Sequence, residues 1–353
     1  IGSMALFVML FSLVFNKQIL QLIYRSIEPQ VMSYARTYFY ITAVSFPFLA
    51  LYNAGAALFR AMGNSKISMK VSLVMNGINI VGNAFFLFVM HMSVEGVALA
   101  TTISQAVSAV LVVNKLMRRT DACKLELKNM RIYGPQLQKM IRIGLPAGIQ
   151  GSMFSISNVM IQSSINSFGD VTIAAWTAIG KTDSINWMIC GAFGVAITTF
   201  VGQNLGSNQP ERARKGVARA LILAVCTTVI VMIPVILFAP QIVAFFNNKP
   251  EVVHYGSLLL RWLSPFYVLC CFNQIYSGAL RGAGNSRAPM IIMLASFVAF
   301  RQAYLFIMSR VWNEILPIAM GYPVGWFLSS FLSTFYYHTH KYKLGKYRLI
   351  EDK

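Results

Sequence analysis

Long apolar segments alternate with short polar connections along most of the chain. Apolar stretches of about 18 residues or more recur, and stretches of that length cross the roughly 30 Å hydrocarbon core of a bilayer as α-helices. The strict alternation of polar and apolar residues typical of transmembrane barrel strands does not occur. The pattern therefore predicts an all-α polytopic membrane protein with about ten transmembrane helices. Their predicted ranges are 1–24, 36–60, 68–90, 95–117, 139–165, 172–203, 217–246, 253–280, 287–309 and 313–337.

The composition supports a membrane protein and argues against two other classes. Hydrophobic residues make up 56% of the chain and charged residues only 12%, whereas soluble domains carry about 25% charged residues. The net charge of +19 comes from Lys and Arg residues that gather between the apolar segments, so we expect no nucleic-acid partner. Most of these cations lie in alternate connections and in the C-terminal tail. The positive-inside rule then predicts a multi-pass protein of the cell (inner or plasma) membrane with a cytoplasmic C-terminus.

A short motif occurs twice. Residues 57–69 read ALFRAMGNSKISM and residues 278–290 read GALRGAGNSRAPM, and both lie on the predicted cytoplasmic side. Chance similarity between two glycine-rich turns is the alternative to a true repeat. A true repeat is parallel, with its halves related by an axis along the membrane normal. The helices at 139–165 and 172–203 then have no partners in the first half, so we expect two further helices before Ile1 and a twelve-helix, two-lobe pseudo-symmetric transporter.

The repeat also defines the expected domains. An N-terminal lobe that lacks its first two helices is expected over residues 1–118, and a cytoplasmic connector over 119–138. A six-helix C-terminal lobe is expected over 139–338, followed by a basic cytoplasmic tail over 339–353. Ile1 already begins a membrane-helix pattern, with no charged segment before it and no small-residue cleavage site after it, so no signal peptide is predicted.

Asp183 is the one acidic residue that lies well inside a predicted span. An ionisable group at that depth costs about 2.5–3.5 kcal/mol on insertion scales and by default marks an ion or substrate path. Asp183 is therefore the candidate for coupling to H⁺ or Na⁺. The alternative is a structural ion pair with Lys181 or Arg301, the two cations inside predicted spans. Lys181 is two residues from Asp183 and does not face it on a helix, whereas an Asp183–Arg301 pair would be a gate or a brace.

Several amides and aromatic residues of the predicted spans are candidates for lining a solute cavity. Amides spaced three and four residues apart share a helix face, where they either hydrogen-bond to another helix or face a cavity. The aromatic residues, with Trp176 among them, either receive a cationic drug by cation–π contact or pack in the core. The cavity-lining candidates are Asn76, Asn79, Asn83, Gln150, Asn158, Gln162, Trp187, Asn273 and Tyr276.

The sequence contains no motif typical of an enzyme active site. The five cysteines have no metal-type spacing, and neither an HExxH motif nor a phosphate-cradling loop is present. We therefore expect no enzyme activity, no metal and no cofactor. Because the sequence contains no ATP-binding domain, transport is expected to draw its energy from an ion gradient or from a partner.

Four motifs resemble those of a known family. They are ALFRAMGNSK at 57–66, GLPAG at 144–148, VGQNLG at 201–206 and LRGAGNSR at 280–287. In this combination and order the chain resembles the multidrug and toxic compound extrusion (MATE) family of cation-coupled efflux transporters. The resemblance implies twelve helices in two lobes, an outward drug pathway, and exchange of substrate for H⁺ or Na⁺.

The chain departs from the family pattern at acidic positions. Some members have an Asp where this chain has Asn83, four residues after Asn79. Other members carry acids in the spans that match 139–165 and 253–280, and neither span contains one here. Asp183 is the leading acidic candidate that remains.

These observations predict a secondary antiporter that exports amphipathic cationic organic compounds or drugs in exchange for H⁺ or Na⁺ by alternating access. Its expected partners are small-molecule organic solutes and the lipid bilayer, and we expect a monomer. One alternative is a lipid-linked oligosaccharide flippase or other polysaccharide-type exporter. Its anionic headgroups would favour a cavity rich in Lys and Arg, but only Lys181 and Arg301 lie inside predicted spans, so this alternative ranks second. An alternative of another class is a membrane scaffold or receptor that transports nothing.

Overall fold

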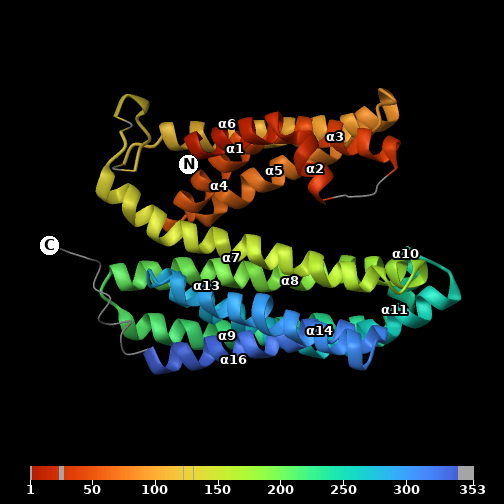
Figure 1. Ribbon diagram of the computed structural model, residues 1–353. Helices are drawn as coiled ribbons and strands as arrows, with labels where there is room; N and C mark the ends of the chain where they lie inside the picture. Colours follow the sequence, from red (N-terminus) through yellow and green to blue (C-terminus); the bar gives the residue numbers. More distant parts are fainter. Residues whose placement is uncertain (1, 24–27, 122, 130, 341–353) are drawn as a thin grey trace. The chain divides into compact units, whose positions relative to one another are not determined.

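The computed structural model describes residues 2–23, 28–121, 123–129 and 131–340. These residues form helices joined by short connections, with no strand among them (Figure 1). The chain divides into two compact units, Ile1–Arg131 and Ile132–Lys353. The prediction of an all-α polytopic membrane protein is confirmed.

The first unit is organised around one long helix, α6, which packs against α3, α4 and α5. Its small core consists of Phe59, Val71, Val112 and Leu116. The elements are α1 (Gly2–Val14), α2 (Asn16–Ile23), α3 (Pro29–Ala43), α4 (Phe46–Ala61), α5 (Ser65–Ala84) with a π-helical extension (Phe85–Val89), α6 (Val94–Met117) and a 3₁₀ turn (Leu127–Asn129).

Two of the predicted spans in this unit are broken helices. The span predicted at 36–60 consists of α3 and α4, which meet at an angle of 47°. The break precedes Pro47, whose ring removes a backbone donor, and the Ser45 hydroxyl donates to the carbonyl of Thr42 at 2.6 Å. The span predicted at 1–24 is divided between α1 and α2, and neither helix alone reaches the length of about 20 residues that a bilayer requires.

The connection after α6 carries an exposed ion pair. Arg119 Nε donates to the Asp121 carboxylate at 2.8 Å. This hydrogen bond holds the pKa of Asp121 below its ordinary value. The second unit then begins its first helix at Gly134, inside the range 119–138 predicted as a connector.

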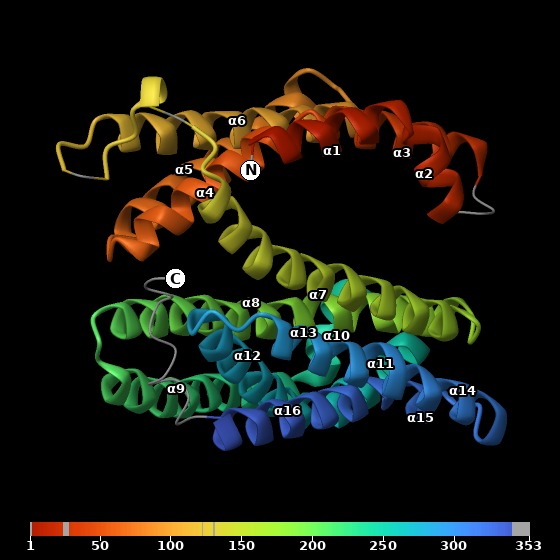
Figure 2. The same ribbon diagram turned by 60° about the vertical axis from the view of Figure 1, so that its left-hand side comes forward.

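The second unit is built around α8 and α12. Helix α12 packs against α8, α9 and α16, and α8 also packs against α9 and α11 (Figure 2). The elements are α7 (Gly134–Asn166), α8 (Asp170–Gly206), α9 (Pro210–Leu237), α10 (Ala239–Phe246), α11 (Pro250–Leu263), a 3₁₀ turn (Ser264–Phe266), α12 (Tyr267–Gly282), α13 (Arg287–Met293), a π-helical segment (Leu294–Phe300), α14 (Arg301–Val311), α15 (Ile315–Ala319) and α16 (Gly321–His340).

Glycine allows α8 and α12 to pack closely. A Cβ atom at Gly278 would lie 2.6 Å from the carbonyl oxygen of Gly194, and one at Gly282 would lie 2.5 Å from that of Thr198. The Thr198 hydroxyl donates across the same contact to the carbonyl of Gly278 at 3.0 Å. Small residues spaced four apart, with interhelical hydrogen bonds, are the usual means by which helices associate in lipid.

The two copies of the sequence motif form the same turn. After α4, Gly63 has φ +76°, and the amide of Asn64 donates to the carbonyl of Phe59 at 2.9 Å. After α12, Gly284 has φ +84°, and the amide of Asn285 donates to the carbonyl of Leu280 at 2.9 Å. This is the Schellman helix end, which requires a left-handed residue that glycine adopts without strain. The two units therefore share a turn as well as a sequence motif.

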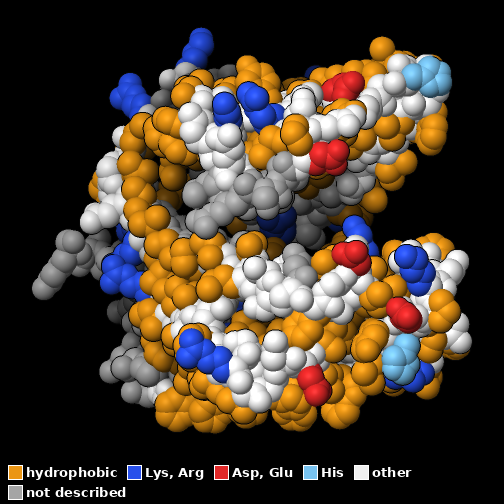
Figure 3. Space-filling view, turned by 45° about the vertical axis from the view of Figure 1, so that its right-hand side comes forward, with side chains coloured by type: hydrophobic (Ala, Val, Ile, Leu, Met, Phe, Trp, Pro, Cys, Tyr) orange, Lys and Arg blue, Asp and Glu red, His pale blue; other side chains and the backbone are white. Residues whose placement is uncertain are grey.

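Seven helices of the described residues are long and apolar enough to cross a membrane, and eight if α3 and α4 count as one span. The predicted number of ten is thus not confirmed. Helix α1 is too short. Helix α7, which covers the span predicted at 139–165, is not among the seven because Gln150, Asn158 and several Ser and Gly residues lower its hydropathy. Many large apolar side chains are exposed on the helices (Figure 3), as expected of surfaces solvated by lipid.

Candidate functional site

A small cavity in the second unit contains the carboxylate of Asp183. Its volume is about 130 Å³. Five helices contribute to it, and most of its lining is aromatic or apolar. The lining residues are Asn158 from α7, Trp176, Ile179, Gly180, Asp183 and Trp187 from α8, Leu263 from α11, Tyr267 from α12, and Tyr322 and Trp326 from α16. The residue that the sequence marks as an intramembrane acid therefore faces a cavity lined by helices of the second unit.

The two carboxylate oxygens of Asp183 differ in their contacts. Oδ2 accepts a hydrogen bond of 3.2 Å from the indole Nε1 of Trp187, one helical turn further along α8. Oδ1 is buried and accepts no hydrogen bond of ordinary geometry among the described residues, although the hydroxyl of Tyr267 on α12 interacts with the carboxylate. A buried acceptor without a donor is costly, so Oδ1 is available to a proton, a cation or a water molecule in the cavity.

Packed aromatic rings form one side of the cavity. The ring centroids of Trp176 and Tyr322 lie 5.3 Å apart, and those of Tyr322 and Trp326 lie 5.9 Å apart. Tyr267 continues the series, with its centroid 5.3 Å from that of Trp326. Such rings exclude lipid and present negative π-faces that attract cations. The sequence analysis missed Tyr267, Tyr322 and Trp326 as cavity residues, because they come from helices far from α8 in the sequence.

Arg301 lies behind this cavity and is completely buried, at 0% exposure. Its Nε donates to the hydroxyl of Ser157 at 3.1 Å, and Nη2 donates to the Asn158 side-chain oxygen at 3.1 Å. The guanidinium also lies over the rings of Phe297 and Tyr322, 4.9 and 5.4 Å from their centroids. Nη1 has no hydrogen-bond partner among the described residues. The structure thus surrounds this cation with dipoles and rings rather than with an acid.

Asp183 and Arg301 do not form an ion pair. The ion pairs between described residues are Arg119–Asp121, Lys124–Glu126 and Arg214–Glu211. Asp183 and Arg301 are nevertheless close to the same two residues, since Asn158 and Tyr322 both contact Arg301 and both line the Asp183 cavity. Lys181, the third charged candidate, is exposed on α8 and does not line the cavity.

The amide candidates of the first unit mainly bind one another. Asn79 donates to the hydroxyl of Thr101 on α6 at 3.2 Å, and Asn83 donates to the side-chain oxygen of Asn79 at 3.2 Å. This pattern joins α5 to α6, which is the helix-packing alternative considered for these residues. Asn76 is exposed.

The remaining candidates of the second unit lie outside the Asp183 cavity. Gln150 is buried and accepts a 3.3 Å hydrogen bond from Arg281. Asn273 is buried, donates to Ser329 and accepts from Ser277. Tyr276 packs on Tyr337, with ring centroids 4.8 Å apart. Gln162 is half-buried on α7. The structure therefore brings Asn158 and Trp187 to Asp183 and places these other side chains elsewhere.

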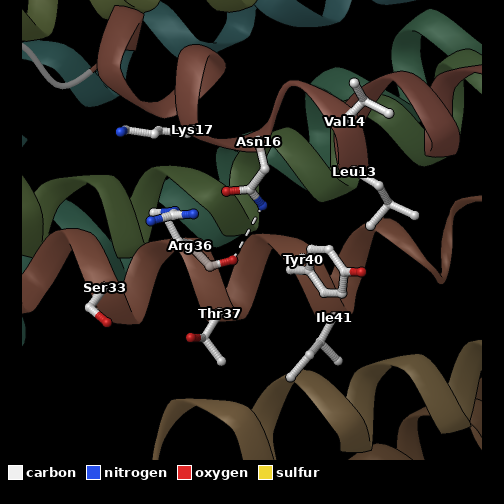
Figure 4. A pocket seen from close by; sticks show the side chains of 9 residues that line it. All are labelled: Leu13, Val14, Asn16, Lys17, Ser33, Arg36, Thr37, Tyr40 and Ile41. Atoms are coloured by element: carbon white, nitrogen blue, oxygen red, sulfur yellow. Dashed lines mark hydrogen bonds between the residues drawn. The ribbon is translucent and has the colours of Figure 1, made fainter.

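The described residues also contain a second polar cavity and a pair of neighbouring cysteines. In the first unit, a cavity of about 400 Å³ lies where α1 and α2 meet α3, and Asn16 donates there to the backbone oxygen of Arg36 at 3.3 Å (Figure 4). It contains Lys17 and Arg36 but no acid. In the second unit, the buried thiols of Cys190 and Cys271 lie 3.7 Å apart. No group of three or more His, Cys, Asp or Glu side chains suited to a metal occurs in the described part of the chain.

A helical membrane protein with the carboxylate of Asp183 facing a small cavity between its helices has the features of a transporter. The comparison with protein families agrees with this class. The MatE family model matches residues 1–85 and 146–304. The chain belongs to the MATE family, and the resemblance noted in its motifs is confirmed.

Relatives and solved structures support the same assignment. The chain is 25% identical to the probable multidrug resistance protein YpnP of Bacillus subtilis over 318 residues, which cover 88% of this chain and 69% of the relative. It is 24% identical to the multidrug export protein MepA of Staphylococcus haemolyticus over 83% of this chain and 64% of the relative.

Among solved structures, a multidrug resistance MATE family transporter in an outward-facing conformation matches with a TM-score of 0.90. It is 18% identical, over 97% of this chain and 76% of that one. A MOP superfamily transporter from Pyrococcus furiosus, described as having a binding pocket of reverse polarity, also matches with a TM-score of 0.90, 18% identity and the same coverage. These structural likenesses confirm the fold of a multi-pass transporter.

Proposed function

We propose that the protein is a secondary antiporter that exports amphipathic cationic organic compounds in exchange for H⁺ or Na⁺, and that Asp183 is the coupling residue. The observation that carries this proposal is the Asp183 carboxylate, which borders a cavity and has no cationic partner among the ion pairs of the described residues, only the neutral donors Trp187 and Tyr267. Membership of a transporter family and the names of the relatives, which describe multidrug export, support the same function.

The size of the cavity favours the coupling ion over the drug as its occupant. A cavity of about 130 Å³ has room for about four water molecules at roughly 30 Å³ each. Drug-sized ligands occupy pockets of about 300–1,000 Å³. A proton, or a sodium ion with its waters, fits beside Asp183, and the exported compound binds elsewhere.

The positions of the lining residues suggest how the ion is coupled to movement. Asp183 is on α8, whereas Tyr267 and Tyr322 approach the cavity from α12 and α16. With a charged carboxylate, the cavity favours a hydrated or cation-bound state. Once the charge is neutralised, the carboxyl group loses its hold on water and the aromatic walls can close around it. Cation binding thereby shifts the balance between two packings of the lobe, which is the requirement for alternating access.

A flippase or exporter of anionic lipid-linked sugars is the second candidate. The specific observation in its favour is Arg301, which is fully buried and has no acidic partner within 4.0 Å among the described residues. Several of its donors are already used by Ser157 and Asn158. We therefore rank this function below cation-coupled efflux. We retain the flippase as the second candidate because the fold also resembles that of a transporter described as having a binding pocket of reverse polarity.

We further propose a monomer with its C-terminus in the cytoplasm, since the cations of the connections favour that orientation. A scaffold or receptor without transport is the third possibility, and ethidium export by wild type in the following experiment would exclude it.

Ethidium accumulation in efflux-deficient cells tests the proposed function. The full-length protein is compared with Asp183→Asn and Asp170→Asn at equal membrane expression. Asp170 is the matched control, because it is an exposed acid in the first turn of the same helix. We expect wild type and Asp170→Asn to lower accumulation and Asp183→Asn to leave it high. If both variants export as well as wild type, Asp183 is not the coupling residue. If wild type does not export, the multidrug function is wrong.

A further inference from the structure

A groove between α8 and α9 combines a basic end with an apolar end. Its volume is about 710 Å³. Arg212, Lys215 and Arg219 line it from α9, and Phe193, Phe200 and Leu223 complete its apolar part. Both helices belong to the second unit and pack on each other, so the groove is complete within that unit.

The three cations share one face of α9. Their spacing of three and four residues places them in a row along the helix. The ion pairs among the described residues include none of the three. Arg214, on the same turns of α9, instead binds Glu211 at 2.6 Å and does not line the groove. The groove therefore contains an unneutralised row of positive charge, while a neighbouring arginine is paired.

The location of this charge adds to its effect on an anion. Helix α9 begins at Pro210, so Arg212 lies in its first turn, where the helix dipole is also positive. Lys215 and Arg219 follow about one and two turns further along. No Asp or Glu lines the groove. Its charge is complementary to a phosphate or phosphodiester.

The groove also has the polarity gradient of a lipid. From Arg212 to Leu223 the helix rises about 16 Å at 1.5 Å per residue, and the lining changes from charged to apolar along this length. The exposed side chain of Leu223 and the half-buried ring of Phe193 offer surface for an acyl chain. The ring of Phe200 lies against Gly216, where a Cβ atom would be 2.1 Å from Phe200 Cε1. This ring therefore forms the floor of the groove between Lys215 and Arg219.

We propose that the α8–α9 groove is a binding site for an anionic phospholipid of the membrane, with its phosphate on Arg212, Lys215 and Arg219 and an acyl chain against Phe193 and Leu223. Basic pockets between transmembrane helices are known to hold such headgroups. The site is separate from the Asp183 cavity and does not depend on the proposed transport function.

Native mass spectrometry of the full-length protein in detergent tests this site. The probes are cardiolipin and phosphatidylglycerol, with phosphatidylcholine as the neutral lipid. We expect the anionic lipids to be retained in preference to phosphatidylcholine. Because one cation near an anionic lipid is worth roughly fivefold in affinity, Arg219→Gln should weaken phosphatidylglycerol binding about fivefold. Arg214→Gln makes the same charge change outside the groove and should have little effect.

Two further arms establish that a lipid, and not merely a phosphate, is bound. Ala196→Trp fills the apolar part of the groove from α8 while keeping every charge, and it should also abolish selective retention. Glycerol 3-phosphate should compete poorly, because it lacks the acyl chain. Equal losses for Arg219→Gln and Arg214→Gln, unchanged binding in Ala196→Trp, or full competition by glycerol 3-phosphate would each overturn the proposal.

Discussion

Replacing Gly282 by alanine tests the close packing of α8 and α12, which supports the whole second unit. The added Cβ atom would lie 2.5 Å from the Thr198 carbonyl oxygen and 3.0 Å from Val201 Cβ, whereas ordinary contacts are 3.4–4 Å. The obstacles are a backbone atom and a buried side chain, so the two helices must separate by up to about 1 Å. Overpacking of this kind costs about 1–3 kcal/mol.

Gly191→Ala on α8 is the matched control. A Cβ atom at Gly191 meets nothing within 4 Å. Gly278 and Gly191 both lie inside helices, so Gly278→Ala and Gly191→Ala each gain up to about 1 kcal/mol in helix propensity, and that gain cancels when these two variants are compared. Gly282 is the last residue of α12 and gains less, so the packing cost of about 1–3 kcal/mol and the smaller gain both lower the stability of Gly282→Ala relative to Gly191→Ala.

Thermal unfolding of the detergent-solubilised full-length protein measures this difference. At about 2–4 °C per kcal/mol for a domain of this size, Gly282→Ala should unfold about 2–12 °C below Gly191→Ala. Gly278→Ala, whose Cβ atom would lie 2.6 Å from the Gly194 carbonyl oxygen, should behave like Gly282→Ala. Equal melting temperatures for Gly282→Ala and Gly191→Ala would refute the close approach of these helices.

Two further predictions concern buried polar groups of the second unit. Arg301→Lys keeps the charge but loses hydrogen-bond donors of the guanidinium, so it should destabilise the protein by about 1.5–3 kcal/mol. The control Arg310→Lys changes an exposed residue of the same helix and should have little effect. Similar melting temperatures for the two variants would contradict the hydrogen bonding of Arg301. The Cys190 and Cys271 thiols, 3.7 Å apart, should form a disulfide when the membrane-permeant oxidant diamide accepts their two hydrogens. Cys190→Ser should prevent it, and intact-mass and peptide analysis showing both thiols still free in wild type would contradict the contact.

The fold class could be predicted because the composition and the apolar periodicity reflect lipid solvation directly. The broken helices were harder to predict. Apolar character runs through the bend before Pro47, so hydropathy alone joins two segments that the backbone separates. Gln150 and Asn158 in α7 have the opposite effect, since they lower the hydropathy of a long helix.

The candidate site could be predicted only in part. Asp183 is recognisable because a carboxylate inside an apolar segment is unusual in any context. Tyr322 and Trp326 carry no such signal, because aromatic residues are common in membrane helices and only tertiary packing brings α16 to α8. Tyr276 is the opposite case: its aromatic side chain is predicted from the sequence to line the cavity, but the ring packs on Tyr337 instead. Opposite charges inside predicted spans make an Asp183–Arg301 ion pair one expectation from the sequence. In the structure, Ser157 and Asn158 accept the hydrogen bonds of Arg301 instead.

Transport by purified full-length protein in proteoliposomes, driven by an imposed pH or Na⁺ gradient, tests the central claim most directly. Wild type, Asp183→Asn and the control Asp170→Asn are reconstituted at equal density, and movement of a cationic dye is followed under each gradient. We predict that one gradient drives dye movement in wild type and Asp170→Asn, and that Asp183→Asn responds to neither. Gradient-driven transport by Asp183→Asn at the wild-type rate would contradict the assignment of Asp183 as the coupling residue.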